Sequence, residues 1–216
     1  MLPDEHVRAA LSAAVTVEEV MRTICAKLGR LLAHHEALEG EPVGTLGKPV
    51  VDADLDAAEA VMGRLLPEDA RALYLCRNGS MGFSPDVEFR TLETALKIWR
   101  IGYGGLELPI LSNAPGWVEP EVRYPVLDMD RVGLCVLTTV GSRRRTSPVL
   151  LLDVDADQFT VVAYTFEALI DWFIDGFERG EAELTEHGVF WKSEEIMAFP
   201  PDMQPLGTAT GPDPLG

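Results

Sequence analysis

The stretch that decides the fold runs from Asp54 to Gly79 and reads DLDAAEAVMGRLLPEDARALYLCRNG. In its first half apolar residues recur three or four positions apart, at Leu55, Ala58, Val61, Met62 and Leu65. This spacing predicts a helix over residues 54–66. Pro67 suits the first position of a second helix, because proline lacks the N–H that would stay unbonded there. Asn78 and Gly79 tolerate the left-handed conformation of a helix C-cap, so the second helix is expected to end there.

The residues before this stretch predict more helix. Residues 4–39 form an expected N-terminal helical part, in which apolar residues again recur at helical spacing. Thr16 and Glu19 fit a capping box that restarts the helix within this part. Residues 40–51 contain glycines and prolines and are expected to be a loop.

The residues after this stretch change from helix to strand and back to helix. The expected elements are a loop with a short strand over 80–90, a helix over 91–101, strands over 106–111, 124–127, 132–140, 148–154 and 159–163, and a final helix over 165–180. This order predicts an α+β fold with an antiparallel or mixed sheet. We expect a single domain over residues 1–198 and a Pro- and Gly-rich flexible tail over 199–216.

The charge of the chain narrows the choice of partner. The 216 residues include 35 acidic and 18 basic side chains, which gives a formal net charge of −17. Such a charge repels nucleic acid and anionic membranes and attracts basic proteins. One basic cluster, Arg143 to Arg145, is expected on a solvated hairpin tip and is too small for a nucleic-acid site against this net charge. We therefore predict a basic protein partner, with no direct nucleic-acid or membrane binding.

The cysteines and the N-terminus favour a cytoplasmic protein. Cys25, Cys76 and Cys135 are odd in number and far apart in sequence, which predicts reduced and mostly buried thiols. The first residues show no basic region followed by an apolar run, so no signal peptide is expected. No apolar stretch approaches the length of a membrane span.

The sequence offers no convincing metal site. A partial calcium-loop pattern of alternating carboxylates occurs at Asp153, Asp155 and Asp157. Gln158 and Tyr164 stand where such a loop needs Gly and Glu, so a polar hairpin turn is the favoured interpretation and a weak cation site the alternative. His34 and His35 are neighbours on a helix and point about 100° apart, which makes a shared metal unfavourable. We predict neither a metal nor a cofactor.

Catalytic patterns are also missing from the sequence. No Gly-x-Ser-x-Gly elbow occurs, and no histidine is placed by sequence to activate a serine or a cysteine. Acidic pairs are plentiful, but nothing in the sequence selects one pair. We therefore predict that the protein is not an enzyme.

The decisive stretch resembles the SUKH superfamily, which includes fungal cell-wall assembly regulators and bacterial immunity proteins. The residues that carry the resemblance are Leu55, Glu59, Met62, Gly63, Leu66, Pro67, Tyr74, Asn78 and Gly79, then the helix from Thr91 to Trp99, and finally Pro125, Gly133, Thr165, Phe166 and Glu167. Tyr124 departs from the pattern, since the family usually has Trp there. The resemblance implies a SUKH-like α+β fold over roughly residues 10–195, in which the motif residues hold the fold and function lies on the variable surface.

The resemblance implies a protein-binding function. The first hypothesis is an immunity protein that neutralises a toxin by direct binding, with a basic nuclease as the expected toxin class. The alternatives are a regulatory scaffold of the cell-wall assembly regulator type, or a small-ligand sensor or enzyme with an unrecognised pocket. Candidate partner-binding residues are the acidic side chains on turns and one tryptophan: Glu119, Glu121, Asp128, Asp130, Asp153, Asp155, Asp157 and Trp117.

Overall fold

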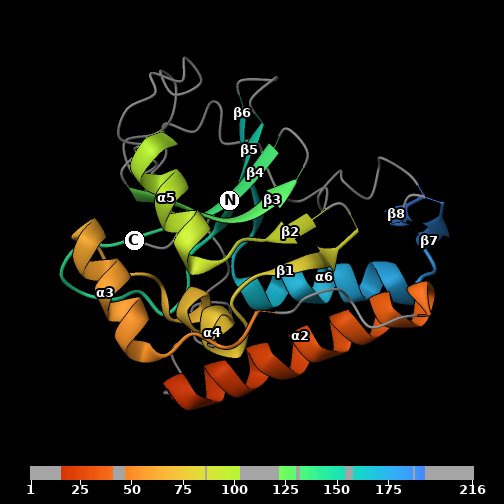
Figure 1. The fold of residues 1–216 in the computed structure, drawn as a ribbon, viewed down its shortest axis with the longest axis horizontal. Helices are drawn as coiled ribbons and strands as arrows, with labels where there is room; N and C mark the ends of the chain where they lie inside the picture. Colours follow the sequence, from red (N-terminus) through yellow and green to blue (C-terminus); the bar gives the residue numbers. More distant parts are fainter. Residues whose placement is uncertain are drawn as a thin grey trace, which may run out of the picture.

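The computed structural model describes residues 16–40, 47–85, 87–102, 122–129, 132–153, 158–186 and 188–192. These residues form five helices, a six-stranded antiparallel sheet and a separate two-stranded hairpin (Figure 1). The α+β class expected from the sequence is confirmed. Most of the N-terminal helical part before Thr16 and the expected tail 199–216 lie outside the described residues.

The helices of the described part follow the apolar spacing of the sequence. They are α2 (Val17–Glu39), α3 (Asp52–Met62), α4 (Glu68–Cys76), α5 (Leu92–Gly102) and α6 (Phe166–Glu178). Two of them begin at a threonine N-cap: Thr16 Oγ1 accepts a hydrogen bond from the N–H of Glu19, and Thr165 Oγ1 accepts one from Ala168. These bonds satisfy N–H groups that have no partner inside the first helical turn. The capping role expected for Thr16 is confirmed.

The larger sheet is a meander in which neighbours in sequence are neighbours in space. Its strands are β1 (Ser80–Ser84), β2 (Val87–Phe89), β3 (Arg123–Met129), β4 (Val132–Leu137), β5 (Val149–Asp153) and β6 (Gln158–Ala163). Every pair is antiparallel, and α5 interrupts the meander between β2 and β3. The hairpin expected at Asp153 to Asp157 corresponds to the antiparallel β5–β6 pair, although its tip lies outside the described residues.

One buried apolar cluster joins the helices to the sheet. The long α2 runs along the outside of α4 and α6, as Figure 1 shows. Its buried face meets the aromatic face of α6 and the inner side chains of the strands. The largest buried members are Tyr74, Tyr124, Phe83, Phe89, Phe166 and Phe173. Burying one such side chain stabilises the fold by about 1.5–3 kcal/mol.

The end of α4 differs from the sequence-based expectation. The helix ends at Cys76, and its C-cap Arg77 has an extended backbone rather than a left-handed one. Gly79 does have a positive φ of 86°, but it belongs to the turn that enters β1. Asn78 Oδ1 accepts a hydrogen bond from the N–H of Leu92 (2.7 Å), so this side chain satisfies the start of α5. The Asn-Gly pair therefore links α4, β1 and α5.

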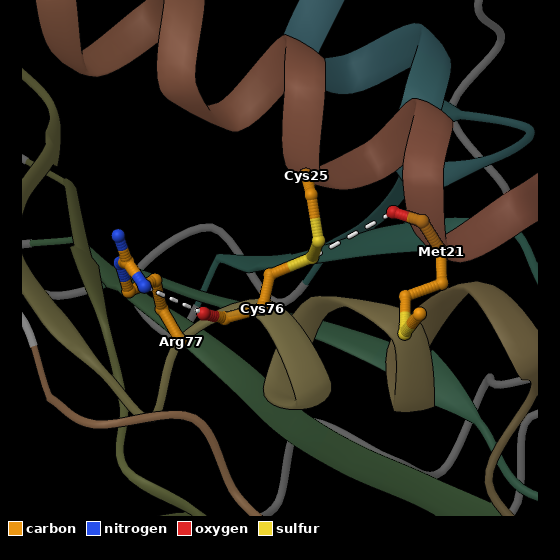
Figure 2. Close-up of a disulfide and its surroundings, with 4 residues drawn as sticks. All are labelled: Met21, Cys25, Cys76 and Arg77. Atoms are coloured by element: carbon orange, nitrogen blue, oxygen red, sulfur yellow. Dashed lines mark hydrogen bonds between the residues drawn. A yellow bond between two sulfur atoms is a disulfide. The ribbon is translucent and has the colours of Figure 1, made fainter. Parts of the chain in front are cut away.

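The expectation that all cysteines are reduced is wrong for two of them. Cys25 on α2 is disulfide-bonded to Cys76 at the end of α4, with the two Cα atoms 5.4 Å apart (Figure 2). The two residues are 51 positions apart in sequence, but the packing of α2 against α4 brings them together. Cys135 is free and fully buried, as expected, and its burial raises the thiol pKa to about 12.

A second hairpin after α6 was not expected. It consists of β7 (Ala182–Thr185) and β8 (Gly188–Trp191), which pair with each other and not with the larger sheet. Trp191 stacks on Phe173 and lies against Phe177, so the hairpin is fixed to α6 by aromatic contacts. None of the described helices has the length and apolar character that crossing a membrane requires.

Candidate protein-binding surface

Most of the residues predicted to bind a partner lie outside the described residues. This holds for Trp117, Glu119, Glu121, Asp130, Asp155 and Asp157. Asp128 and Asp153 are described, as the sixth residue of β3 and the last of β5. Since β4 pairs with both strands, the backbones of Asp128 and Asp153 lie at the same end of the sheet.

Asp128 is only half available to a partner. Its side chain is 45% exposed, and Arg90 Nη2 lies 2.5 Å from its Oδ1. Glu88 on β2 lies directly opposite Asp128 in the strand register and is exposed. The Arg90 guanidinium therefore offsets one of the two carboxylates at this position.

A stronger concentration of acidic side chains lies where two helices end. Helices α2 and α6 run side by side in the same direction. Lys27 near the middle of α2 pairs with Glu167 and Asp171 in the first half of α6, and His34 near the end of α2 lies 3.6 Å from Glu178, the last residue of α6. Figure 1 shows both C-termini beside the β7–β8 hairpin. We call this region the acidic end; its members are Glu36 and Glu39 of α2, Asp175 and Glu178 of α6, and Glu181, Glu183 and Glu186 of the hairpin region.

The backbone adds to the negative potential of the acidic end. A helix C-terminus carries a partial negative charge from its unpaired carbonyl groups. Neither α2 nor α6 has a basic residue in its last turn. Arg30, which pairs with Glu178, and Arg179, which pairs with Glu181, supply opposite charge there. The carboxylates still outnumber these cations.

Two histidines at the acidic end serve the packing of α2 on α6. The His34 ring stacks on Phe177 at a centroid distance of 5.9 Å, and the His35 ring meets the same phenyl ring edge-on. Burial lowers the pKa of His35, although the nearby Glu39 and Glu36 act in the opposite direction. The structure thus gives these histidines a packing role.

The seam between α2 and α6 contains a lysine held by two carboxylates. Lys27 Nζ lies 2.7 Å from Glu167 and 2.5 Å from Asp171. Burial lowers the pKa of Lys27, but the hydrogen bonds and charges of Asp171 and Glu167 outweigh it, so the pKa is raised overall. The two acids are therefore engaged within the molecule and are poor candidates for partner contacts.

An exposed apolar side chain lies within the acidic end. Leu184 on β7 is 52% exposed, and the neighbouring Glu183 is also exposed. Protein interfaces commonly combine an apolar contact with a charged rim. The β7–β8 hairpin therefore presents both elements on one short segment.

Glu59, which lies in the stretch of sequence that predicted two successive helices, is a structural residue. Glu59 is 5% exposed, and its carboxylate accepts hydrogen bonds from the N–H of Leu66 (2.8 Å), Arg71 Nη1 (3.0 Å) and Arg143 Nη2 (2.6 Å). Arg143 Nε also donates to the carbonyl of Leu66. Arg143 lies in the connection between the paired strands β4 and β5, as a hairpin predicts, but its side chain is tied to the fold and the expectation that it is solvated is wrong.

A second buried carboxylate joins α4 to α6. Asp69 accepts hydrogen bonds from the N–H groups of Ala70 (2.9 Å) and Phe166 (3.2 Å). Burial raises the pKa of Asp69 to about 7, although backbone hydrogen bonds act in the opposite direction. This carboxylate lies beneath the start of α6, where it can bind no partner.

Known proteins add no further constraint. No protein-family model and no curated protein matches the chain. Within the residues described, no group of three or more His, Cys, Asp or Glu side chains could hold a metal ion. The acidic end was missed at the sequence level, although its acids stand at the ends of predicted helices, because the sequence does not reveal that α2 and α6 run in parallel.

Proposed function

We propose that this protein is a non-enzymatic binding module that captures a basic protein through its acidic end. The single observation that carries the proposal is the convergence of the α2 and α6 C-termini with the acidic β7–β8 hairpin. A net charge of −17 supports it, because electrostatic attraction speeds the encounter with a basic surface. Leu184 would supply the apolar contact at the centre of this charged rim.

The partner class that we propose is a toxin, with the protein as its immunity factor. This choice rests on the SUKH-like residues of the sequence, of which Glu59, Leu66 and Asn78 make structural contacts within the fold. Surfaces that bind nucleic-acid phosphates are basic, so a nuclease toxin would be complementary to the acidic end. Binding there would block such a surface by occupying it.

The cytoplasm is the compartment that we propose for this encounter. The absence of a membrane-spanning helix among the described residues is compatible with it. The Cys25–Cys76 disulfide argues for contact with an oxidising environment, since disulfides are uncommon in the cytosol. Rapid alkylation of thiols in intact host cells, followed by mass spectrometry, would decide between a cytosolic reduced form and an exported oxidised form.

The test of the proposed function is capture from host lysate with paired variants. Asp175→Asn combined with Glu183→Gln removes two charges from exposed positions of the acidic end. Asp54→Asn combined with Glu93→Gln removes two charges from exposed positions on α3 and α5 and serves as the matched control. We expect wild type and control to retain one basic protein at low salt and to release it at high salt.

The acidic-end variant should bind the captured protein about five- to thirty-fold more weakly than the control, since each of the two rim charges contributes roughly 0.5–1 kcal/mol. Leu184→Ser should also weaken binding. We expect this variant mainly to raise the dissociation rate constant and to change the association rate constant little. Equal binding by both double variants would overturn the acidic end as the site. A captured basic protein without toxic activity would keep the binding function and replace the immunity role by that of a scaffold.

A further inference from the structure

A basic hollow lies near the N-terminal end of α6, far from the acidic end. It has a volume of about 400 Å³ and is formed where the end of β4 and the loop after it meet the segment between α3 and α4. Its lining residues are Arg64, Val122, Leu137, Thr138, Thr139, Val140, Ser142 and Arg144. The 13-residue α6 separates the two regions by about 20 Å. A volume of this size lies within the range of small-ligand sites.

The charge of this hollow is opposite to that of the molecule. Among the residues that the structure describes, Arg64 and Arg144 are the two ionisable residues that line it, and none of the lining residues is a carboxylate. The structure gives Arg64 no ion pair with any residue of the described part, whereas Arg71 and Lys27 each contact two or more carboxylates. In a chain with almost twice as many acids as bases, an arginine without a carboxylate partner at a hollow favours an external anion.

The walls of the hollow are fixed by hydrogen bonds. Leu65 and Thr139 exchange both backbone hydrogen bonds, at 2.7 and 2.9 Å, which holds the residue beside Arg64 against the end of β4. Thr138 Oγ1 donates to the carbonyl of Val122, and Thr139 Oγ1 donates to that of Ser142. The site is thus formed before any ligand arrives, so binding need not order a loop.

The lining also includes an apolar part. Val122, Leu137 and Val140 line the hollow together with the two arginines, and Val140 is 66% exposed. Ser142 adds a hydroxyl for which no side-chain hydrogen bond is recorded in the described part. Planar guanidinium groups bind carboxylate and phosphate oxygens in a bidentate manner. Arginines beside apolar side chains suit a ligand that consists of an oxyanion attached to a small apolar group.

We propose that this hollow binds a small organic oxyanion, namely a carboxylate or a phosphate monoester, with Arg64 and Arg144 contacting the anionic group and Val140 the apolar body. The proposal is independent of the protein-binding function, because the two regions lie at opposite ends of α6. A ligand there would contact the segment between α3 and α4 and the end of β4, which are joined by the Leu65–Thr139 hydrogen bonds.

The test is calorimetric titration of the full chain with phenyl phosphate, benzoate and inorganic phosphate at one constant ionic strength. Arg64→Gln removes the guanidinium that has no ion pair, and Arg22→Gln removes a highly exposed one from α2 as the matched control. Val140→Asp places a carboxylate at the rim, and Val51→Asp does so at an exposed position elsewhere. Circular dichroism checks that each variant is folded.

We expect phenyl phosphate or benzoate to bind more tightly than inorganic phosphate, since only the first two fill the apolar part. Arg64→Gln and Val140→Asp should each weaken that binding about ten-fold or more, while Arg22→Gln and Val51→Asp leave it unchanged. Comparing phenyl phosphate with benzoate identifies which oxyanion the site prefers. Two results would overturn the proposal. One is that no probe binds at about 20 mM, a concentration on the order of the weakest meaningful affinity. The other is that Arg64→Gln and Arg22→Gln weaken binding equally.

Discussion

Cys25 in the middle of α2 is covalently linked to Cys76, the last residue of α4. The bond links the long outer helix to the end of α4 (Figure 2), from which the chain continues through Asn78 and Gly79 into β1. Cys76 Sγ also lies 3.7 Å from the carbonyl oxygen of Met21, which can accept a hydrogen bond from the thiol when the disulfide is reduced. The fold therefore has a partner ready for Cys76 in either redox state.

Reduction should destabilise the protein without unfolding it. Closing a loop of 51 residues restricts the unfolded chain, and such a bond contributes about 2–4 kcal/mol. We expect the double variant Cys25→Ser, Cys76→Ser to lose this amount in urea denaturation. A thiol count on denatured, unreduced wild type should find the single free Cys135. Three free thiols, or an unchanged stability on adding reductant, would contradict the disulfide.

Neutralising Glu59 should lower the free energy of unfolding more than neutralising any other carboxylate that contacts Arg71 in the described part. Glu59→Gln leaves the Arg71 and Arg143 guanidinium groups facing a neutral amide in a buried place, which costs about 3 kcal/mol or more. Asp56→Asn, at an exposed carboxylate that pairs with the same Arg71, should cost less than about 1 kcal/mol. Urea denaturation midpoints of the two variants decide the matter, and equal losses would show that Glu59 is not the centre of the cluster.

Asp69 should make the protein less stable as the pH rises from 4 to 7. The pKa of Asp69 is about 7 in the folded protein, whereas the ordinary aspartate value of 3.8 applies to the unfolded chain. Between these two values the folded chain therefore holds a proton that the unfolded chain releases. The stabilisation is complete below pH 3.8 and lost above about 7, with a size on the order of 4 kcal/mol. His35, whose pKa burial lowers, acts in the opposite sense below pH 6.5 in every variant.

The contribution of Asp69 is isolated by comparing slopes. The free energy of unfolding is measured against pH for wild type and for Asp69→Asn. Between pH 4 and 7 the wild type should lose stability relative to Asp69→Asn, because only the wild type has this titrating group. The exposed Asp54→Asn serves as the control and should keep the wild-type profile. Parallel profiles for all three proteins would contradict the raised pKa.

Two glycine-to-alanine changes should act in opposite directions. At Gly79 the φ of 86° is unfavourable for alanine, and a Cβ would lie 2.8 Å from Thr91 Cγ2 and 3.2 Å from the carbonyl oxygen of Phe89. Gly79→Ala should therefore destabilise the protein by about 1–3 kcal/mol. Gly29 lies exposed within α2 with open space around it, so Gly29→Ala should stabilise by about 0.5–1 kcal/mol. Thermal melts of both variants test the pair, and a loss at Gly29 would contradict the helical assignment there.

The periodicity of the sequence was enough to place the described helices and strands β3 to β6, whereas β1 and β2 occupy residues 80–89, where only a loop with one short strand was expected. Local signals did this work: Thr16 and Thr165 marked helix starts, and alternating apolar runs marked β3 to β6. The sequence did not predict the β7–β8 hairpin, because its strands are short and carry exposed charges. The hairpin is held by the packing of Trp191 on α6. That contact joins residues whose proximity no local pattern encodes.

The sequence by itself determined the α+β class, the acidity of the chain and the capping role of Thr16, because these follow from composition and from interactions within a few residues. Only the tertiary structure decided that Cys25 meets Cys76, that Arg143 is bound by Glu59, and that the ends of α2 and α6 unite in one acidic surface. Each of these depends on the packing of helices far apart in the chain. Packing direction is set by the whole buried surface, and no single stretch of sequence contains it.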